Sequence, residues 1–263
     1  MRKTAGGGDT VITKIQVVGV GRMKVPGPEV FWMERFDEEL ALTLWMVVVQ
    51  TVDRVLLINT GVAANDTAVP ELVDGIAGGG MAGLKSLGIT AEQVTDVVIT
   101  PLQAYAIGNA DQFPRATIHL SRRGWMDYHA PPRPTSTRER HRAIPWPVLI
   151  SLWRERWPQL HLLHDEDTII AKTVTVSWVG CHHRSSLVIW VQTETGVFAF
   201  TDIIFHPENF TEDKPIGIAE DRYECLKAYA LIRSRADQVF GLYDPGLERA
   251  FPDGVLFRTS STS

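Results

Sequence analysis

Five polar side chains with acid, base or hydrogen-bonding chemistry stand at the ends of predicted strands: Gln103, Tyr105, His182, Asp202 and Tyr243. An imidazole titrates near neutral pH and can take a proton from water, and a neighbouring carboxylate can orient it. A phenol can donate a hydrogen bond to a developing oxyanion. A pocket that gathers these groups can therefore carry out acid/base chemistry.

The remaining histidines show no recognisable metal-ligand spacing. His183 follows His182 directly. It would serve as a substitute metal ligand only if the two side chains pointed the same way, whereas adjacent loop residues usually point apart. His206 follows Asp202 by four residues, so it either lines the same pocket or lies in an exposed loop.

Cys181 and Cys225 are the only cysteines. Two are too few for a disulfide framework, so we expect a cytoplasmic protein. A bridge between them is the less favoured alternative. Although Cys181 stands beside His182, its position near the predicted core favours a buried, unreactive thiol over a nucleophile.

The composition is that of a globular chain. It has 263 residues, 44% hydrophobic and 22% charged, with a formal net charge of -5. Lysine and arginine are scattered, which argues against nucleic acid as a partner, and no apolar run is long enough to span a membrane. We expect a flexible N-terminus over residues 1–10, one domain over 11–257 and a tail over 258–263.

Apolar runs predict the elements that position the polar residues. The predicted strands are 11–20, 42–51, 54–58, 94–100, 116–120, 168–179, 186–193, 197–201 and 238–242. Helical spacing occurs over 70–87, interrupted by three glycines at 78–80, and over 221–235. These alternating strands and helices predict an α/β fold.

An insertion at about residues 125–158 is rich in Pro, Trp and Arg. We interpret it as irregular loops with a short helix, in the manner of a lid. Trp146 and its neighbouring aromatic residues either form a wall over the pocket or pack the insertion onto the body, and the second interpretation is favoured.

Residues 97–109, VVITPLQAYAIGN, resemble the signature loop of the metallo-β-lactamase superfamily, in which a buried strand runs into HxHxDH. The ligand positions of that motif fall on Pro101, Gln103, Tyr105 and Ala106. Proline and alanine cannot bind a metal through their side chains.

Other segments are similar to the same family in order and spacing. Residues 180–186, GCHHRSS, resemble its GxHTPGS loop, and Asp202 follows a strand like its bridging aspartate. Tyr243 stands where its last ligand histidine would be, and Asn59 begins a segment that is commonly Asp-Thr-Gly. The segment 202–210, DIIFHPENF, resembles the N-acyl homoserine lactonases, with Phe205 at the position of their tyrosine near the substrate carbonyl.

The resemblance implies an αββα sandwich, two mixed sheets flanked by helices, covering roughly residues 11–257. It also implies a degenerate metal site, because only His182 and Asp202 keep ligand identity among seven positions. Metal-ion catalysis of this kind needs three or four ligands for each zinc, so we expect no resident metal and no other cofactor.

We therefore expect a metal-independent, hydrolase-like or lyase-like enzyme that acts on a lactone, an ester or a related carbonyl compound. Asp202 would orient His182 as general base, and Tyr105 or Tyr243 would stabilise the oxyanion, with Gln103 beside them. Phe205, His183, His206 and Trp146 are the expected substrate-binding residues. The alternatives are an inactive binding protein and a mononuclear metal hydrolase. The expected partner is a small-molecule substrate or ligand, and the inactive alternative would bind a small molecule or a protein through the same cleft. The oligomeric state stays open, with a homodimer as one alternative.

Overall fold

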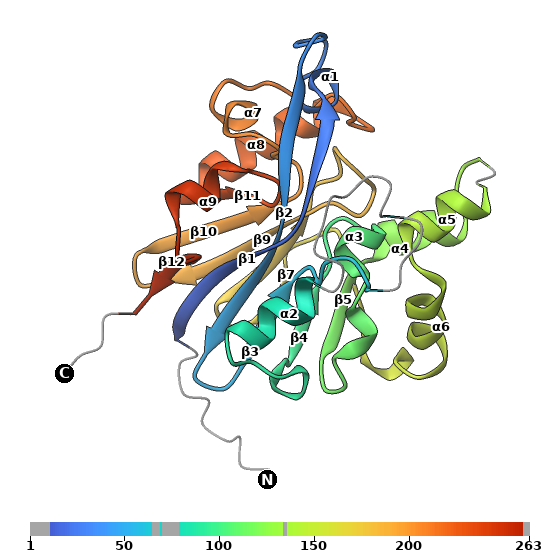
Figure 1. Ribbon diagram of the computed structural model, residues 1–263, viewed down its shortest axis with the longest axis vertical. Helices are drawn as coiled ribbons and strands as arrows, with labels where there is room; N and C mark the ends of the chain where they lie inside the picture. Colours follow the sequence, from blue (N-terminus) through green and yellow to red (C-terminus); the bar gives the residue numbers. More distant parts are fainter. Residues whose placement is uncertain (1–10, 65–68, 70–78, 134–135, 260–263) are drawn as a thin grey trace.

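Two mixed β-sheets lie face to face in the computed structural model, which describes residues 11–64, 69, 79–133 and 136–259 (Figure 1). The seven-stranded sheet has the order β12-β1-β2-β3-β4-β5-β6. Its strands are β1 (Ile12–Pro26), β2 (Glu39–Thr51), β3 (Val55–Ile58), β4 (Asp96–Val98), β5 (Thr117–Ser121), β6 (Leu160–Leu163) and β12 (Val255–Arg258). β3 to β6 run parallel, and β12, β1, β2 and β3 pair antiparallel.

The five-stranded sheet has the order β11-β10-β9-β8-β7. Its strands are β7 (Thr168–Ala171), β8 (Val174–Trp178), β9 (Leu187–Thr193), β10 (Gly196–Thr201) and β11 (Gln238–Gly241). Only β10 and β11 pair in parallel. The carboxyl ends of β10 and β11 therefore lie at the same edge of this sheet.

Both faces of β2 are buried, which explains its continuous apolar sequence. Val47 and Val49 face the second sheet, in a core that includes Phe198 and Phe200. Met46 and Val48 belong to the core on the other face. β2 is therefore covered on both faces and lies at the centre of the layered α/β structure.

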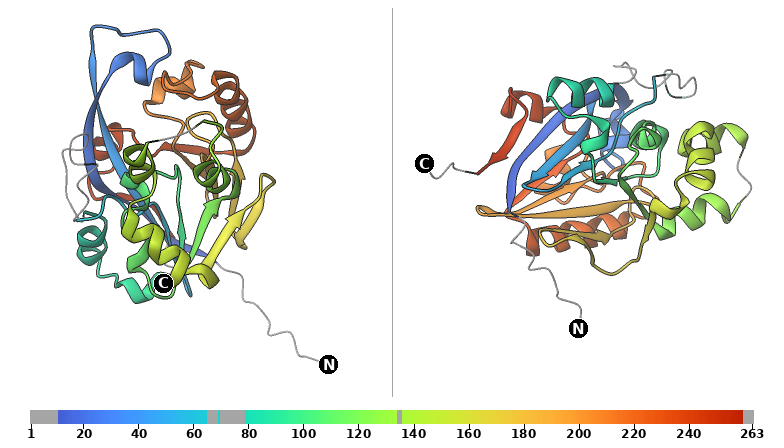
Figure 2. Two further views of the ribbon diagram at one scale, coloured as in Figure 1. Left: turned by 90° about the vertical axis from the view of Figure 1, so that its right-hand side faces the viewer. Right: turned by 90° about the horizontal axis from the view of Figure 1, so that it is seen from below.

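Helices cover the outer faces of the two sheets (Figure 2). α2 (Gly79–Ser86) packs directly on β1, where a Cβ on Gly83 would lie 2.4 Å from Val18 Cγ1. α8 (Arg222–Arg235) covers the five-stranded sheet, and its buried residues Cys225, Ala228, Tyr229 and Ile232 follow helical spacing. The shorter helices are α1 (Gly27–Val30), α3 (Ala104–Ile107), α7 (Pro207–Thr211) and α9 (Gly246–Ala250).

The αββα sandwich predicted from the sequence is confirmed. One detail of the prediction was wrong. Residues 168–179 form two strands, β7 and β8, because the chain turns at 172–173. The interruption at the three glycines, 78–80, stays a prediction, since α2 begins at Gly79, at the edge of the described residues. The predicted helical stretch over 70–78 and the predicted flexible segment over 1–10 lie outside the described residues.

The Pro- and Trp-rich insertion is more ordered than predicted. It contains three helices, α4 (Arg122–His129), α5 (Thr137–Ala143) and α6 (Trp146–Arg154), which project beyond the β5 and β6 edge (Figure 1). Serine residues cap the first two, Ser121 for α4 and Ser136 for α5, and a proline follows the first residue of α6. These local start signals outweighed a composition that is typical of loops.

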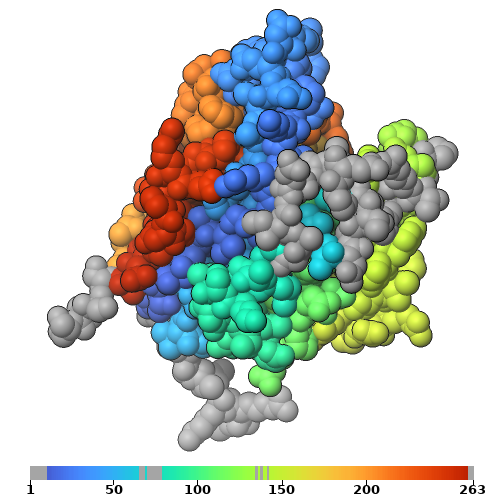
Figure 3. All heavy atoms as spheres, in the orientation of Figure 1, coloured from blue at the N-terminus to red at the C-terminus, as the bar shows by residue number. Residues whose placement is uncertain are grey.

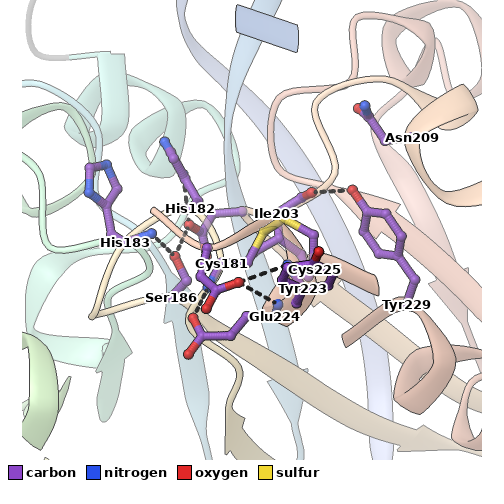
Figure 4. The surroundings of a disulfide bond; sticks show 12 residues. Cys181, His182, His183, Ser186, Ile203, Asn209, Tyr223, Glu224, Cys225 and Tyr229 are labelled. Atoms are coloured by element: carbon purple, nitrogen blue, oxygen red, sulfur yellow. Dashed lines mark hydrogen bonds and ion pairs between the residues drawn. A yellow bond between two sulfur atoms is a disulfide. The ribbon is translucent and has the colours of Figure 1, made fainter. Parts of the chain in front are cut away.

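Cys181 and Cys225 form a disulfide, so the prediction of a free, buried thiol at Cys181 was wrong (Figure 4). The bridge joins the loop before β9 to the first turn of α8, where the two Cα atoms lie 4.9 Å apart. Sequence separation hid this proximity, because the two cysteines stand 44 positions apart. The prediction of a cytoplasmic setting relied on the low number of cysteines, and it loses that support.

The disulfide should stabilise the folded chain. We expect the double variant Cys181→Ala, Cys225→Ala to lose about 3 kcal/mol of unfolding free energy, because the bridge closes a long loop in the unfolded state. Denaturant unfolding of the wild type and the variant, each with and without reductant, measures this. Reductant should lower the stability of the wild type only. Two alkylatable thiols in unreduced, unfolded wild type would contradict the bridge.

Candidate active site

The carboxylate of Asp202 is the centre of the site. Asp202 directly follows β10, is fully buried, and accepts three hydrogen bonds. The donors are Thr100 Oγ1 at 2.5 Å, Ser186 Oγ at 2.6 Å and His182 Nδ1 at 3.0 Å. Burial opposes ionisation of Asp202, but the bonds from His182, Ser186 and Thr100 hold its pKa below the ordinary value. The group is therefore an anion with its charge satisfied by the protein.

Thr100 connects the two sheets at this point. Besides donating to Asp202, its Oγ1 accepts a bond from the backbone N–H of Leu187 at 2.9 Å, at the start of β9. Its own backbone N–H donates to Asn59 Oδ1 at 2.9 Å, and its carbonyl accepts from Asn59 Nδ2 at 2.8 Å. Asn59 has a positive φ of 63°, which asparagine tolerates better than most residues.

The imidazole of His182 is buried and neutral at neutral pH. Burial lowers its pKa to about 4, the proximity of His183 acts in the same direction, and the bond to Asp202 opposes both. Because Nδ1–H donates to Asp202, the lone pair lies on Nε2. Among the described residues none forms a hydrogen bond with Nε2.

Aromatic side chains surround this imidazole. The ring of Phe205 lies 4.9 Å from the ring of His182, and the ring of Tyr243 lies 6.0 Å from it. The hydroxyls of Tyr105 and Tyr243 are 3.2 Å apart. Burial raises the pKa of both phenols, so both remain protonated donors at neutral pH. One of the two O–H groups donates to the other hydroxyl, which leaves the second O–H for a ligand.

The structure brings most of the predicted site residues together. His182, Asp202, Tyr105, Tyr243 and Phe205 form the cluster just described. His183 lies beside it, with its ring 4.1 Å from the ring of His182, so the two adjacent histidines do not point fully apart (Figure 4). Gln103 precedes α3, the helix that carries Tyr105.

Two predicted substrate-binding residues have other surroundings. His206 begins α7, packs against Phe31 and accepts a bond from the backbone of Glu208. Trp146 begins α6 and is 37% exposed. The favoured interpretation, that the aromatic residues pack the insertion onto the body, holds for the buried Trp125 and Tyr128 but not for Trp153 and Trp157, which are exposed.

Thr100 and Ser186 are site residues that the sequence interpretation did not single out. A signal for Ser186 existed, since it ends the segment that resembles the GxHTPGS loop. Thr100 precedes the first of the four substituted ligand positions and carried no signal. A groove of about 800 Å³ between α2 and α9, with Gly19, Thr43 and Trp45 in its floor, contains none of the predicted site residues (Figure 3).

The described side chains do not fit a pair of metal ions. In the part of the chain that the structure describes, no group of three or more His, Cys, Asp or Glu side chains is arranged to hold one. Both oxygens of Asp202 already accept bonds from protein donors. Two phenols, whose rings lie 6.2 Å apart, replace ligands of the family: Tyr105 stands at the aspartate of the signature motif, and Tyr243 stands at the last ligand histidine.

Two mixed sheets flanked by helices, with polar loops gathered at one edge, define a fold of the metallo-β-lactamase type. No protein-family model and no curated protein matches the sequence. Among solved structures, the chain is similar to an N-acyl homoserine lactone hydrolase with N-hexanoyl-L-homoserine at its catalytic metal centre. The TM-score is 0.74 at 16% identity, over 92% of this chain and 98% of the other.

Two further structures have the same fold. One is a probable metal-dependent hydrolase from Staphylococcus aureus, with a TM-score of 0.71 at 14% identity over 90% of this chain and 91% of the other. The other is AidC, a dizinc quorum-quenching lactonase, with 0.66 at 15% identity over 97% and 96%. The predicted likeness to lactonases is thus confirmed for the fold, and these neighbours are described as metal enzymes. The described residues contain no helix long and apolar enough to cross a membrane.

The stability of the protein should depend on pH through His182. The pKa of His182 is about 4 in the folded chain, and its ordinary value of 6.5 applies to the unfolded chain. Between these two pH values only the unfolded chain therefore takes up the proton. The unfolding free energy should therefore fall by about 3 kcal/mol as the pH decreases from about 6.5 to about 4. Denaturant titrations across this range measure the slope.

The variant His182→Asn keeps a side-chain N–H for Asp202 and cannot titrate, so its slope should be smaller by about 1.4 kcal/mol per pH unit. The exposed His164 offers a matched control, and His164→Asn should keep the slope of the wild type. Equal slopes for the wild type and His182→Asn would contradict the lowered pKa.

The hydroxyl of Thr100 should matter more than its methyl group. We expect Thr100→Val to lose about 3 kcal/mol of unfolding free energy, because Asp202 loses a donor and the Leu187 N–H loses its acceptor. Thr100→Ser keeps the hydroxyl and should lose about 1 kcal/mol. Equal stability of the two variants in denaturant titrations would show that the hydroxyl has no such role.

Proposed function

We propose that this protein is a metal-independent hydrolase of a small carbonyl compound, either a lactone or an ester. The observation that carries the proposal is the hydrogen bond between His182 Nδ1 and Asp202, which leaves Nε2, near two phenols, with no hydrogen-bond partner among the described residues. The lactone or ester class rests on the likeness in fold to lactonases, which is an analogy. The metal independence rests on the side chains of this chain.

The proposed reaction uses water as nucleophile. Nε2 of His182 accepts a proton from a water molecule while the water oxygen forms a bond to the carbonyl carbon. The carbonyl oxygen becomes an oxyanion and accepts a hydrogen bond from the O–H that the Tyr105 and Tyr243 pair leaves over. The oxyanion then collapses, the bond to the alkoxy oxygen breaks, and that oxygen takes the proton back from Nε2.

Asp202 acts through His182 in this scheme. As an anion it fixes the imidazole tautomer and stabilises the imidazolium that forms during the reaction. The low pKa of His182 keeps the base unprotonated at neutral pH but also weakens it. We therefore expect slow turnover, with no loss of activity from protonation of His182 between pH 6 and pH 8.

The burial of His182 also favours a second function. The imidazole of His182 is 3% exposed and its affinity for a proton is low, as expected for a site that binds a carbonyl compound without hydrolysing it. Saturable binding of a lactone or ester with no turnover would support this binding protein and contradict the hydrolase.

The test is a panel of lactones, esters and thioesters, assayed with chelator-treated protein. We expect slow hydrolysis that survives chelation, and a loss of at least a hundredfold in kcat for His182→Ala, as is typical when a general base is removed. His164→Ala replaces an exposed histidine and should keep the wild-type rate. Activity that chelation abolishes and zinc restores would instead support a mononuclear metal hydrolase.

A further inference from the structure

Large apolar side chains lie exposed along one face of α6, and the proposed reaction does not use them. Trp146, Ile150 and Trp153 follow one another at helical spacing and are 37%, 48% and 50% exposed. The other face of α6 is already buried in the core, through Val148 and Leu152. A surface helix ordinarily exposes polar side chains opposite its buried face, so a second apolar face indicates contact with something outside the chain.

The exposed apolar surface continues beyond α6. The ring of His129 in α4 stacks on the ring of Trp153, with 5.3 Å between centroids, and so joins the two helices. Met126 precedes His129 by three residues on the same side of α4 and is 52% exposed. Trp157 begins the 3-10 helix η3 (Trp157–Gln159), four residues after Trp153, and is 55% exposed. We call the following set the tryptophan face: Met126, Trp146, Ile150, Trp153 and Trp157.

The insertion that carries the tryptophan face is basic, although the protein as a whole is acidic. Residues 122–157 contain eight arginines, no lysine and three acidic residues, so their formal charge is +5, whereas that of the whole chain is -5. Arg122 and Arg154 are exposed and form no ion pair in the part of the chain that the structure describes. Arg122 stands four residues before Met126 in α4, and Arg154 directly follows Trp153. Basic and apolar side chains therefore border one another on this surface.

We propose that the tryptophan face binds the surface of a membrane that contains anionic phospholipids. Tryptophan is enriched at membrane–water interfaces, because its ring is apolar while its N–H can bond to polar groups. Arginine binds phosphate with two parallel N–H bonds, and anionic lipids attract basic side chains near the membrane surface. The helices of the insertion project from one side of the molecule, so a broad surface can meet the tryptophan face before it meets the sheets (Figure 1).

The binding is peripheral. The apolar side chains enter the boundary between head groups and acyl chains, and the arginines stay at the level of the phosphates. The rest of the chain has a formal charge of -10, since the insertion contributes +5 to a total of -5. This charge asymmetry orients the molecule, with the insertion toward an anionic surface and the acidic body away from it.

The charge of the insertion disfavours a second copy of the chain as the occupant. In a symmetric dimer the same patch on each copy contacts its counterpart. Two insertions of charge +5 would then face each other, and like charges across an interface oppose binding. A bilayer with anionic lipids offers the opposite charge instead.

Sedimentation of the chain with lipid vesicles tests the proposal. Vesicles of phosphatidylcholine and phosphatidylglycerol in equal parts are compared with vesicles of phosphatidylcholine alone, at low salt. We expect the mixed vesicles to bind the chain about tenfold more tightly or better, and added salt to weaken this binding. Tryptophan emission should shift to shorter wavelength on binding, because the exposed rings leave water.

The arginines are tested with a charge-matched control. The double variant Arg122→Gln, Arg154→Gln should bind the mixed vesicles about tenfold more weakly or worse, since each arginine contributes to the attraction. The double variant Arg249→Gln, Arg258→Gln changes the net charge by the same amount, removes two exposed arginines outside the insertion, and should bind like the wild type.

The apolar contribution has its own pair of variants. Trp157→Ser should weaken binding to the mixed vesicles about tenfold, because it removes an exposed ring from the tryptophan face. Trp32→Ser removes an exposed tryptophan from the β1–β2 hairpin and should keep the wild-type affinity. All four variants replace exposed side chains, and denaturant unfolding should show the stability of the wild type within about 1 kcal/mol.

Three results would overturn the proposal: no binding to mixed vesicles up to millimolar lipid, equal binding to both kinds of vesicle, or equal losses in the Arg122, Arg154 variant and its control. A dimer that forms without lipid and is lost in Trp157→Ser, with no binding to vesicles, would assign the tryptophan face to a second copy instead. Because these measurements involve no hydrolysis, they stand whether or not the carbonyl panel shows turnover.

Discussion

The Asp202 carboxylate is a full negative charge buried between two sheets, and the donors around it determine how the neighbouring loops are arranged. Thr100 reaches it from the end of the β4 segment, and Ser186 and His182 reach it from the loop before β9. An unpaired charge at this depth would cost several kcal/mol, so the three donors and the carboxylate depend on one another. This cluster connects the two sheets at the edge where the candidate site lies.

The rest of the site follows from this arrangement. The bond from His182 Nδ1 to Asp202 sets the tautomer, which leaves Nε2 facing the aromatic side chains. The loop that carries His182 is fixed on its other side, where the disulfide and the bond from the Cys181 N–H to Glu224 attach it to α8. Protein hydrogen bonds thus stabilise Asp202, the residue that resembles a metal-bridging aspartate.

The fold and much of the cluster could be predicted from the sequence, because strand ends and loop motifs are local patterns. The run that ends at Pro101 and the Asp202 segment indicated the αββα sandwich although most ligand positions had changed. The disulfide and the Thr100 bond could not be predicted, since each joins residues more than forty positions apart. Only one short helix was predicted in the insertion, which contains three, because its Pro and Trp content obscured their capping residues.

The stoichiometry of bound zinc tests most directly whether protein donors satisfy Asp202. Chain purified from zinc-supplemented culture and passed through a desalting column can be analysed for metal by mass spectrometry. Since both carboxylate oxygens are engaged by Thr100, Ser186 and His182, we expect far less than one zinc ion per chain. Two tightly held zinc ions per chain, lost together in Asp202→Asn, would contradict the account.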